Sequence, residues 1–292
     1  PADHTKDITP QKPPHMEYAK IFLGNTMWLE NNKGMEETTF ELTVRDQPKN
    51  WGYFVFYGLD RFLTYVKNFK FTDKQIKVLV EMNLVKKEHI SFYKNFKFNG
   101  DILSIDEGTP FFAGEPILRM TGTMIETNLM TALVLNAFSY PTRVLTKITR
   151  QNIAAGKKRF SSAGSVRSQG FEQVLINLFA CQIGGSMSSI QPISYYADAS
   201  IPRNNLQANI NHATISSFDN EREAISFAIK KILPHQPALQ IMVDTYDMKK
   251  GLAILIDELK KTTFENQKKI WVPIDSGNVY ETAKHMRKEL DK

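Results

Sequence analysis

Residues 238–260 read ALQIMVDTYDMKKGLAILIDELK, and residues 269–290 read KIWVPIDSGNVYETAKHMRKEL. Each stretch opens with a short apolar run, passes through a polar turn that carries aspartate, and ends in a helix-period pattern. Short strands that alternate with helices are typical of a parallel α/β arrangement, because each helix carries the chain back to the start of the next strand. These stretches therefore predict an α/β fold for the C-terminal part of the chain.

The same patterns extend the prediction toward the N-terminus. Thr72 and Gln75 have the spacing of a capping box, which predicts the start of a helix. Pro141 suits the first turn of a helix, so we expect one helix to end before it and another to begin there. The expected helices cover 16–29, 58–69, 72–82, 87–96, 123–140, 141–155, 171–182, 213–232, 248–260 and 279–290, and the expected strands cover 38–44, 52–56, 100–105, 116–120, 238–243 and 269–274.

Composition limits the class of protein. The chain has 292 residues, of which 42% are hydrophobic, so two domains with a sizeable core are expected. We expect an extended proline-rich arm over 1–15, an N-terminal α/β domain over 16–140 and a partial α/β barrel over 141–292. The single cysteine, Cys181, excludes an internal disulfide and a cysteine-based metal cluster. No apolar run is long enough to span a membrane.

The charge balance says little about partners. The formal net charge of +6 favours anionic partners only weakly. The sequence contains no nucleic-acid-binding motif, so we do not expect nucleic acid as a partner.

A series of short motifs carries a family resemblance. Their order and spacing, rather than any single motif, resemble the nicotinate phosphoribosyltransferase family of type II phosphoribosyltransferases over roughly residues 16–292. The motifs are GLDRFL at 58–63, FTDKQI at 71–76, KFNGDI at 97–102, EGTP at 107–110, GEPILR at 114–119, residues 126–136, TKITR at 146–150, GG at 184–185, the segment around 212, DTYD at 244–247 and DSG at 275–277.

The resemblance implies a fold and a reaction. The fold is an N-terminal α/β domain beside an irregular α/β barrel. In the reaction, nicotinate attacks C1 of 5-phosphoribosyl-1-pyrophosphate and gives nicotinate mononucleotide and pyrophosphate for NAD salvage. Mg²⁺ is required, and ATP hydrolysis through a phosphohistidine drives the reaction. The resemblance also implies a cytoplasmic location. The sequence opens with Pro1 rather than Met, and a mitochondrial location is the alternative if this reflects a cleaved presequence.

Candidate site residues follow from the positions that match the motifs. The resemblance implies that His212 is the phosphorylated histidine, although an incidental hydrogen-bonded histidine is an open alternative. Lys147 and Arg150 lie one helical turn apart, so both can point into one cleft. The candidate substrate-binding residues are Lys147, Arg150, Arg167, Gly184, Gly185, Asp244, Asp275, Ser276 and Gly277; no metal-ligating set is identified.

The aspartates allow two interpretations. Carboxylates at the carboxyl ends of strands are where α/β proteins place chemistry. Asp244, Asp247 and Asp275 could equally cap the helices that follow them, because Asp is a favoured residue before a helix.

Several positions depart from the family pattern. Val166 stands where the first of two consecutive arginines is expected, and valine cannot replace a guanidinium that binds an anion. The N-terminal element that carries a ring-stacking tyrosine is replaced by TPQK at 9–12. The other departures are at Ser162, 186–191, Pro273 and Asn278.

The length of the barrel part predicts an incomplete barrel. About 150 residues follow Pro141, whereas a full eight-stranded α/β barrel takes about 250. We therefore expect a protein partner, or a second copy of the chain, to cover the open side.

Three functions fit the sequence. The first is a degenerate family member that acts as a structural or assembly subunit of a larger complex. The second is an active nicotinate phosphoribosyltransferase, dependent on Mg²⁺ and ATP, that another chain completes. The third is a regulatory partner that binds a phosphoribosyl or nucleotide ligand without turnover.

Overall fold

The computed structural model describes residues 18–158, 161–162, 167–188, 208–236, 238–263, 269–274 and 276–291. The expected proline-rich arm over 1–15 lies outside these residues. The chain forms two compact units, residues 1–195 and 196–292. The expected domain division at 140/141 stays a prediction. Each unit has its own hydrophobic core.

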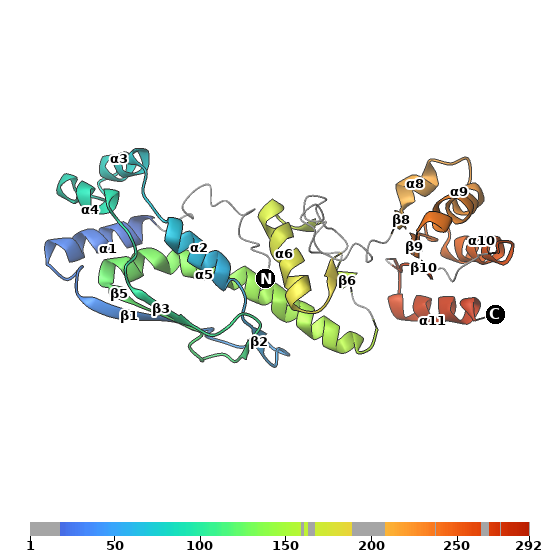
Figure 1. Cartoon of the computed structure of the whole chain (residues 1–292), viewed down its shortest axis with the longest axis horizontal. Helices are drawn as coiled ribbons and strands as arrows, with labels where there is room; N and C mark the ends of the chain where they lie inside the picture. Colours follow the sequence, from blue (N-terminus) through green and yellow to red (C-terminus); the bar gives the residue numbers. More distant parts are fainter. Residues whose placement is uncertain are drawn as a thin grey trace. The chain divides into compact units, whose positions relative to one another are not determined.

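A three-stranded antiparallel sheet organises the first unit (Figure 1). The strands are β1 (Glu37–Leu42), β5 (Leu118–Thr123) and β3 (Asp101–Ser104), in the order β1-β5-β3. Exposed and half-buried residues alternate along β1, as expected for a strand with one solvated face. Helix α5 (Met124–Ala155) packs against β1 and β5 and contacts α1 (Tyr18–Glu30).

Three short helices surround an aromatic core in this unit. They are α2 (Leu59–Asn68), α3 (Asp73–Glu81) and α4 (Ile90–Lys94), and a 3₁₀ turn at Lys87–His89 precedes α4. The expected capping box is confirmed, because the Thr72 hydroxyl accepts from the Gln75 amide while the Gln75 side chain accepts from the Thr72 amide. The core is rich in phenylalanine, with edge-to-face contacts of the kind that aromatic rings prefer.

Helix α5 corrects the prediction of two helices. It runs without a break through Pro141, although proline removes one backbone donor from the helix interior. The proline leaves the Ala137 carbonyl without its usual helical donor, and the Gly58 backbone packs beside that carbonyl. A Cβ at Gly58 would lie 2.5 Å from Ala137 O, and the Gly58 φ of 122° also favours glycine.

The helical turns of α5 that follow Pro141 contact a second small sheet. Strand β2 (Phe54–Val55) pairs with β4 (Pro110–Phe111) rather than with β1. The Val55 amide donates to Thr146 Oγ1 at 2.8 Å, and the Tyr57 amide donates to Thr142 Oγ1 at 3.3 Å. These bonds attach β2 and the residues that follow it to the part of α5 after the proline.

After α5, the described residues of the first unit add one helix and one strand pair. Helix α6 (Phe171–Ile183) packs against α5, and β6 (Ser161–Ser162) pairs in parallel with β7 (Met187–Ser188). Cys181 is buried on α6, and burial raises the pKa of its thiol.

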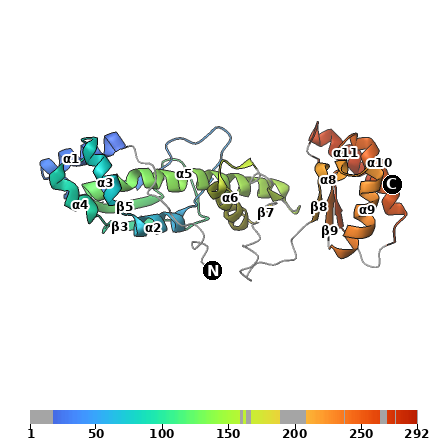
Figure 2. The same ribbon diagram turned by 90° about the horizontal axis from the view of Figure 1, so that it is seen from above.

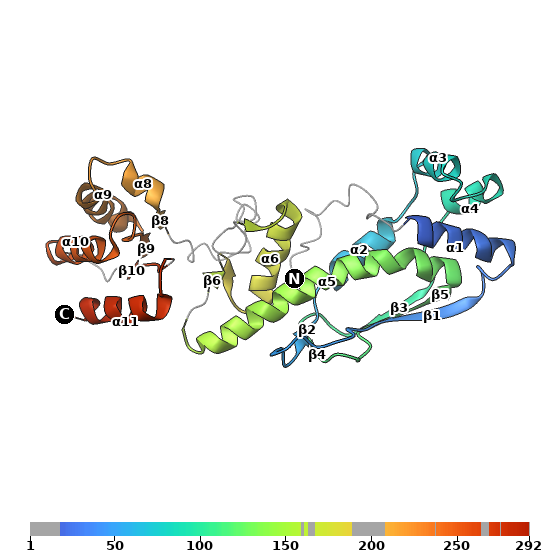
Figure 3. The same ribbon diagram turned by 180° about the vertical axis from the view of Figure 1, so that it is seen from behind.

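The second unit is a parallel α/β fold (Figures 2 and 3). Its strands are β8 (Ala208–Ile210), β9 (Ala238–Ile241) and β10 (Lys269–Trp271), in the order β10-β9-β8. Helix α10 (Met248–Lys260) follows β9, and α11 (Val279–Leu290) follows β10, as the sequence predicts. Among the described residues the parallel strands do not close into a barrel, so the fold is an N-terminal domain with a partial α/β part.

The helix expected over 213–232 is divided in the structure. Helix α8 (His212–Ser216) ends, and α9 (Glu221–Phe227) begins after Asn220, whose side chain accepts from the Glu223 amide. A π-helical turn at Ala228–Ile232 then continues α9. The helical spacing of apolar residues continues through both helices, so it predicts a single helix. Asn220 is the local signal for a second one, because Asn is a favoured helix-capping residue.

In the part of the chain that the structure describes, no helix has the length and apolar character needed to cross a membrane.

Candidate functional site

His212 lies at the carboxyl end of the parallel sheet. Asn211 caps α8, and His212 is the first residue of that helix, directly after β8. Its Nδ1 is 3.0 Å from the Thr245 hydroxyl, and its Nε2 is 3.8 Å from Asp244 Oδ1. The side chain is 44% exposed. The two ring nitrogens therefore have different neighbours, and the ring remains accessible to solvent.

Asp244 links the ends of the three strands. It follows β9, its side chain is only 8% exposed, and its Oδ2 accepts a hydrogen bond of 2.7 Å from the hydroxyl of Ser276. Ser276 follows β10, and His212 follows β8, so residues from three separate loops converge on one carboxylate. This is the edge at which parallel α/β sheets bind ligands.

The aspartates had two interpretations, site carboxylate or helix cap, and the structure shows a different environment for each residue. Asp247 is the cap of α10, because its Oδ1 accepts from the Lys250 amide at 2.9 Å. Asp244 caps none of the described helices; it contacts His212 and Ser276. Asn278 caps α11 by accepting from the Glu281 amide. Asp275 lies outside the described residues, and Gly277 adopts a φ of 68°, which places it in the left-handed region.

The sequence prediction missed Glu221. This residue is 8% exposed in the first turn of α9, and its Oε1 has no hydrogen-bond partner among the described residues. Burial, with the neighbouring charges of Asp247 and Asp244, raises the pKa of its carboxyl. A charged residue in the first turn of a helix is ordinary, so the sequence carries no sign that this one is buried.

Thr245 was also missed as a partner of His212. It belongs to the DTYD motif, but only the motif's aspartates were expected to act. A threonine hydroxyl can donate or accept, so it can hold a histidine ring in either neutral tautomer.

Arg150 is held by its own unit rather than presented as a free cation. Its guanidinium donates to the Asn50 carbonyl at 2.6 Å and lies 5.3 Å from the ring centroid of Trp51, a cation–π distance. Lys147, one turn earlier on α5, is exposed. Arg167 is also exposed, in the turn before α6. The three expected anion-binding cations thus all lie in the first unit.

Gly184 and Gly185 terminate α6 and pack it against α5. A Cβ on Gly184 would lie 2.7 Å from Ile148 Cγ2, so only glycine allows this approach. The Asn152 side chain donates to the Gly184 carbonyl at 3.0 Å, and Gly185 has a φ of 70°. Their structural role in helix packing is therefore clear.

The expected site residues divide between the two units. The second unit brings together His212, Asp244 and Ser276, whereas Lys147, Arg150, Arg167, Gly184 and Gly185 belong to the first. Across the described ranges, no three or more His, Cys, Asp or Glu side chains are grouped so that they could hold a metal ion. Mg²⁺ bound near His212 and Asp244 would therefore depend on the phosphates of a substrate for many of its ligands.

Comparison with known proteins gives a consistent result. A model of the nicotinate phosphoribosyltransferase N-terminal domain matches residues 18–139. The nicotinate phosphoribosyltransferase of Bacillus subtilis (strain 168) is 28% identical over 280 residues, which is 95% of this chain and 55% of that protein. Nicotinate phosphoribosyltransferase pncB2 of Mycobacterium tuberculosis (strain ATCC 25618 / H37Rv) is 26% identical over 281 residues, 93% of this chain and 56% of that protein.

The chain belongs to the nicotinate phosphoribosyltransferase family.

Solved structures agree on the fold of this family member. The crystal structure of human nicotinic acid phosphoribosyltransferase matches with a TM-score of 0.73 at 19% identity, over 94% of this chain and 63% of that one. The structure of nicotinate-nucleotide pyrophosphorylase from Pyrococcus furiosus matches with a TM-score of 0.64 at 20% identity, over 97% and 66%. The chain spans about half the length of the curated relatives that it matches.

Proposed function

We propose that this member of the nicotinate phosphoribosyltransferase family does not catalyse the transfer itself and acts as a structural subunit of a larger assembly. The environment of Arg150 carries the proposal. A guanidinium that binds a phosphate presents its donors to the ligand. In this chain the Arg150 guanidinium donates to the Asn50 carbonyl and lies over Trp51.

Departures of this sequence from the family pattern also support a structural role. Val166 takes a position where an arginine is expected, and TPQK at 9–12 replaces the element that carries the pyridine-stacking tyrosine. A transferase needs cations for two phosphate groups and a flat surface for the pyridine ring. The chain therefore lacks one guanidinium and one ring contact that the family pattern leads us to expect, and one donor of Arg150 is used within the chain.

A second candidate function is the active transferase, completed by another chain. The convergence of His212, Asp244 and Ser276 at the carboxyl ends of three strands favours it. In that case Thr245 would orient the His212 ring through Nδ1, and Asp244 would stabilise positive charge on the ring. ATP would supply the phosphoryl group for His212, as the resemblance implies.

One assay separates the two functions. The full chain is incubated with nicotinate, 5-phosphoribosyl-1-pyrophosphate, Mg²⁺ and ATP, and nicotinate mononucleotide is measured by liquid chromatography. We expect no product above the reagent blank. Product that His212→Ala abolishes, and that the exposed-residue control His235→Ala retains, would overturn the structural role.

A binding measurement under the same conditions tests the third function, a regulatory partner that binds a phosphoribosyl or nucleotide ligand without turnover. Calorimetric titration with 5-phosphoribosyl-1-pyrophosphate and Mg²⁺ is expected to give no heat of binding. Saturable binding without product would instead indicate a regulatory partner that senses a phosphoribosyl ligand.

A further inference from the structure

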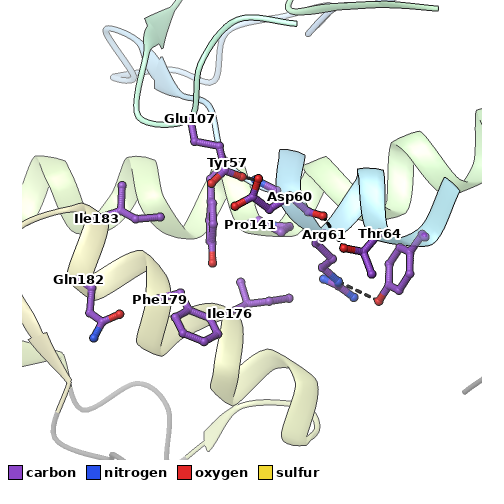
Figure 4. Close-up of a pocket in the computed structure, with 12 residues that line it drawn as sticks. Tyr57, Asp60, Arg61, Thr64, Glu107, Pro141, Ile176, Phe179, Gln182 and Ile183 are labelled. Carbon is purple, nitrogen blue, oxygen red and sulfur yellow. Dashed lines mark hydrogen bonds between the residues drawn. The ribbon is translucent and has the colours of Figure 1, made fainter. Parts of the chain in front are cut away.

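A cavity of about 350 Å³ lies between α2 and α6 in the first unit, with Pro141 of α5 in its wall (Figure 4). Its size is in the range of small-molecule sites. It contains none of the residues that the family resemblance assigns to substrate. The lining residues are Tyr57, Gly58, Asp60, Arg61, Thr64, Tyr65, Glu107, Pro141, Ile176, Phe179, Gln182 and Ile183.

The charge of the lining is negative. Asp60 and Glu107 contribute carboxylates, and Arg61 is the one basic residue among the described residues of the lining. The Arg61 guanidinium is paired with Glu172 and also donates to the Tyr65 hydroxyl at 2.9 Å. Its positive charge is therefore neutralised by a carboxylate outside the cavity lining. A phosphate or carboxylate ligand would meet unfavourable charge there, whereas a cation would meet favourable charge.

Glu107 is held in place by the start of α2. Its Oε1 accepts from the Gly58 amide at 2.8 Å and from the Leu59 amide at 2.5 Å. Burial, together with the neighbouring charge of Asp60, raises the pKa of the Glu107 carboxyl. No ion pair joins Asp60 to another side chain in the described part of the chain. A cation beside both carboxylates would relieve their mutual repulsion.

The opposite wall is apolar and aromatic. Ile176, Phe179 and Ile183 line it from α6, and Pro141 lines it from α5. Figure 4 shows the Tyr57 ring extending from the Glu107 side of the cavity toward Phe179 and Ile176. Aromatic faces beside carboxylates are the surroundings in which proteins recognise alkylated ammonium ions.

We propose that this cavity binds a small organic ammonium ion with an apolar body. The charged end lies between Asp60, Glu107 and the Tyr57 ring, and the body lies against Ile176 and Phe179. The carboxylates set the sign of the ligand charge, and the α6 wall sets its hydrophobic character. The site lies entirely within the first unit.

Titration calorimetry of the full chain tests this assignment. Benzyltrimethylammonium is the cationic probe, benzyl alcohol the neutral one and phenylacetate the anionic one. We expect the ammonium probe to bind at one site per chain, about tenfold or more tightly than either comparison compound. Because the ionised carboxylate attracts the cation, affinity should rise with pH as Glu107 loses its proton.

Variants separate the site from general charge effects. Asp60→Asn and Phe179→Ala are each expected to weaken the ammonium probe by roughly tenfold. Asp106→Asn is the matched control, because Asp106 is an exposed acid one residue before Glu107 and outside the lining. It should leave affinity unchanged. Circular dichroism of each variant establishes that it is folded.

Three results would contradict the proposed ammonium site. Equal binding of the neutral or anionic probe, equal loss in Asp106→Asn, or no binding of the ammonium probe in the millimolar range would overturn the proposal. None of these results bears on the transferase assay, because the cavity shares no residue with the cluster around His212.

Discussion

Individual residues in this chain acquire their roles from partners that are distant in sequence. Asp244 and Asp247 are three positions apart and chemically identical, yet one contacts His212 and Ser276 while the other caps a helix. Arg150 matches a family motif, yet one of its guanidinium donors is directed to the carbonyl of Asn50. Residue identity therefore narrows the possible roles, and the neighbours decide among them.

Glu221 leads to a prediction of pH-dependent stability. Burial raises the pKa of its carboxyl in the folded state, so the folded protein binds this proton more tightly than the unfolded chain does. Ionising Glu221 therefore costs stability, and this cost grows as pH rises from the unfolded pKa through the folded pKa. We expect Glu221→Gln to be more stable than the parent at neutral pH, and equal to it at acid pH below the unfolded pKa.

Urea unfolding at a series of pH values measures this difference. Glu223→Gln is the matched control, since Glu223 is an exposed acid on the same helix. A Glu221→Gln variant that is less stable at neutral pH would contradict a raised pKa at this position.

At the scale of elements, local patterns predicted most helices and strands, and long-range contacts decided the exceptions. The ranges of α10 and α11 agree with the sequence because an amphipathic period and a capping residue both lie within them. Helix α5 differs from the prediction, and the hydroxyls of its Thr142 and Thr146 accept from backbone amides about 90 residues earlier. No local pattern around Pro141 contains that information.

Gly251 in α10 provides a test at this scale. Alanine normally stabilises a helix interior relative to glycine by about 1 kcal/mol. A Cβ at Gly251 would lie 2.1 Å from Val243 O and 3.0 Å from Glu221 Oε1, so α10 would have to move away from the backbone that follows β9. We expect Gly251→Ala to lower the free energy of unfolding by about 1–3 kcal/mol, as overpacking does.

The control for this variant is Gly24→Ala in α1. Beyond its chain neighbours and its own helix backbone, no heavy atom of the described residues lies within 4 Å of a Cβ built on Gly24, so propensity alone should act and the variant should be more stable. Chemical denaturation compares both variants with the parent. Two changes of the same sign would show that helix propensity or global repacking, rather than the contact with Val243, controls the result.

At the scale of the whole molecule, the parallel sheet of the second unit has two edge strands among the described residues, β8 and β10. Unpaired strand edges tend to be covered by another chain. Trp271 on β10 is 39% exposed, which adds apolar surface at one edge. We expect the purified chain to sediment at a multiple of its 33.4 kDa mass at micromolar concentration.

Analytical ultracentrifugation measures this mass. Trp271→Lys should shift the equilibrium toward the monomer, whereas Tyr280→Lys, an exposed change on α11, should leave it unchanged. A monomer at every concentration would argue against a second copy as the covering partner.

The sequence by itself determined the α/β class, the family and the helices whose caps and apolar period are local. The alternation of strands and helices and the order of the motifs are properties of neighbouring residues, so they can be read without coordinates. Only the tertiary structure decided that α5 continues through Pro141, that Arg150 bonds within its own unit, and that Glu221 is buried beside two aspartates. These outcomes depend on contacts between residues far apart in the chain, which no local pattern encodes.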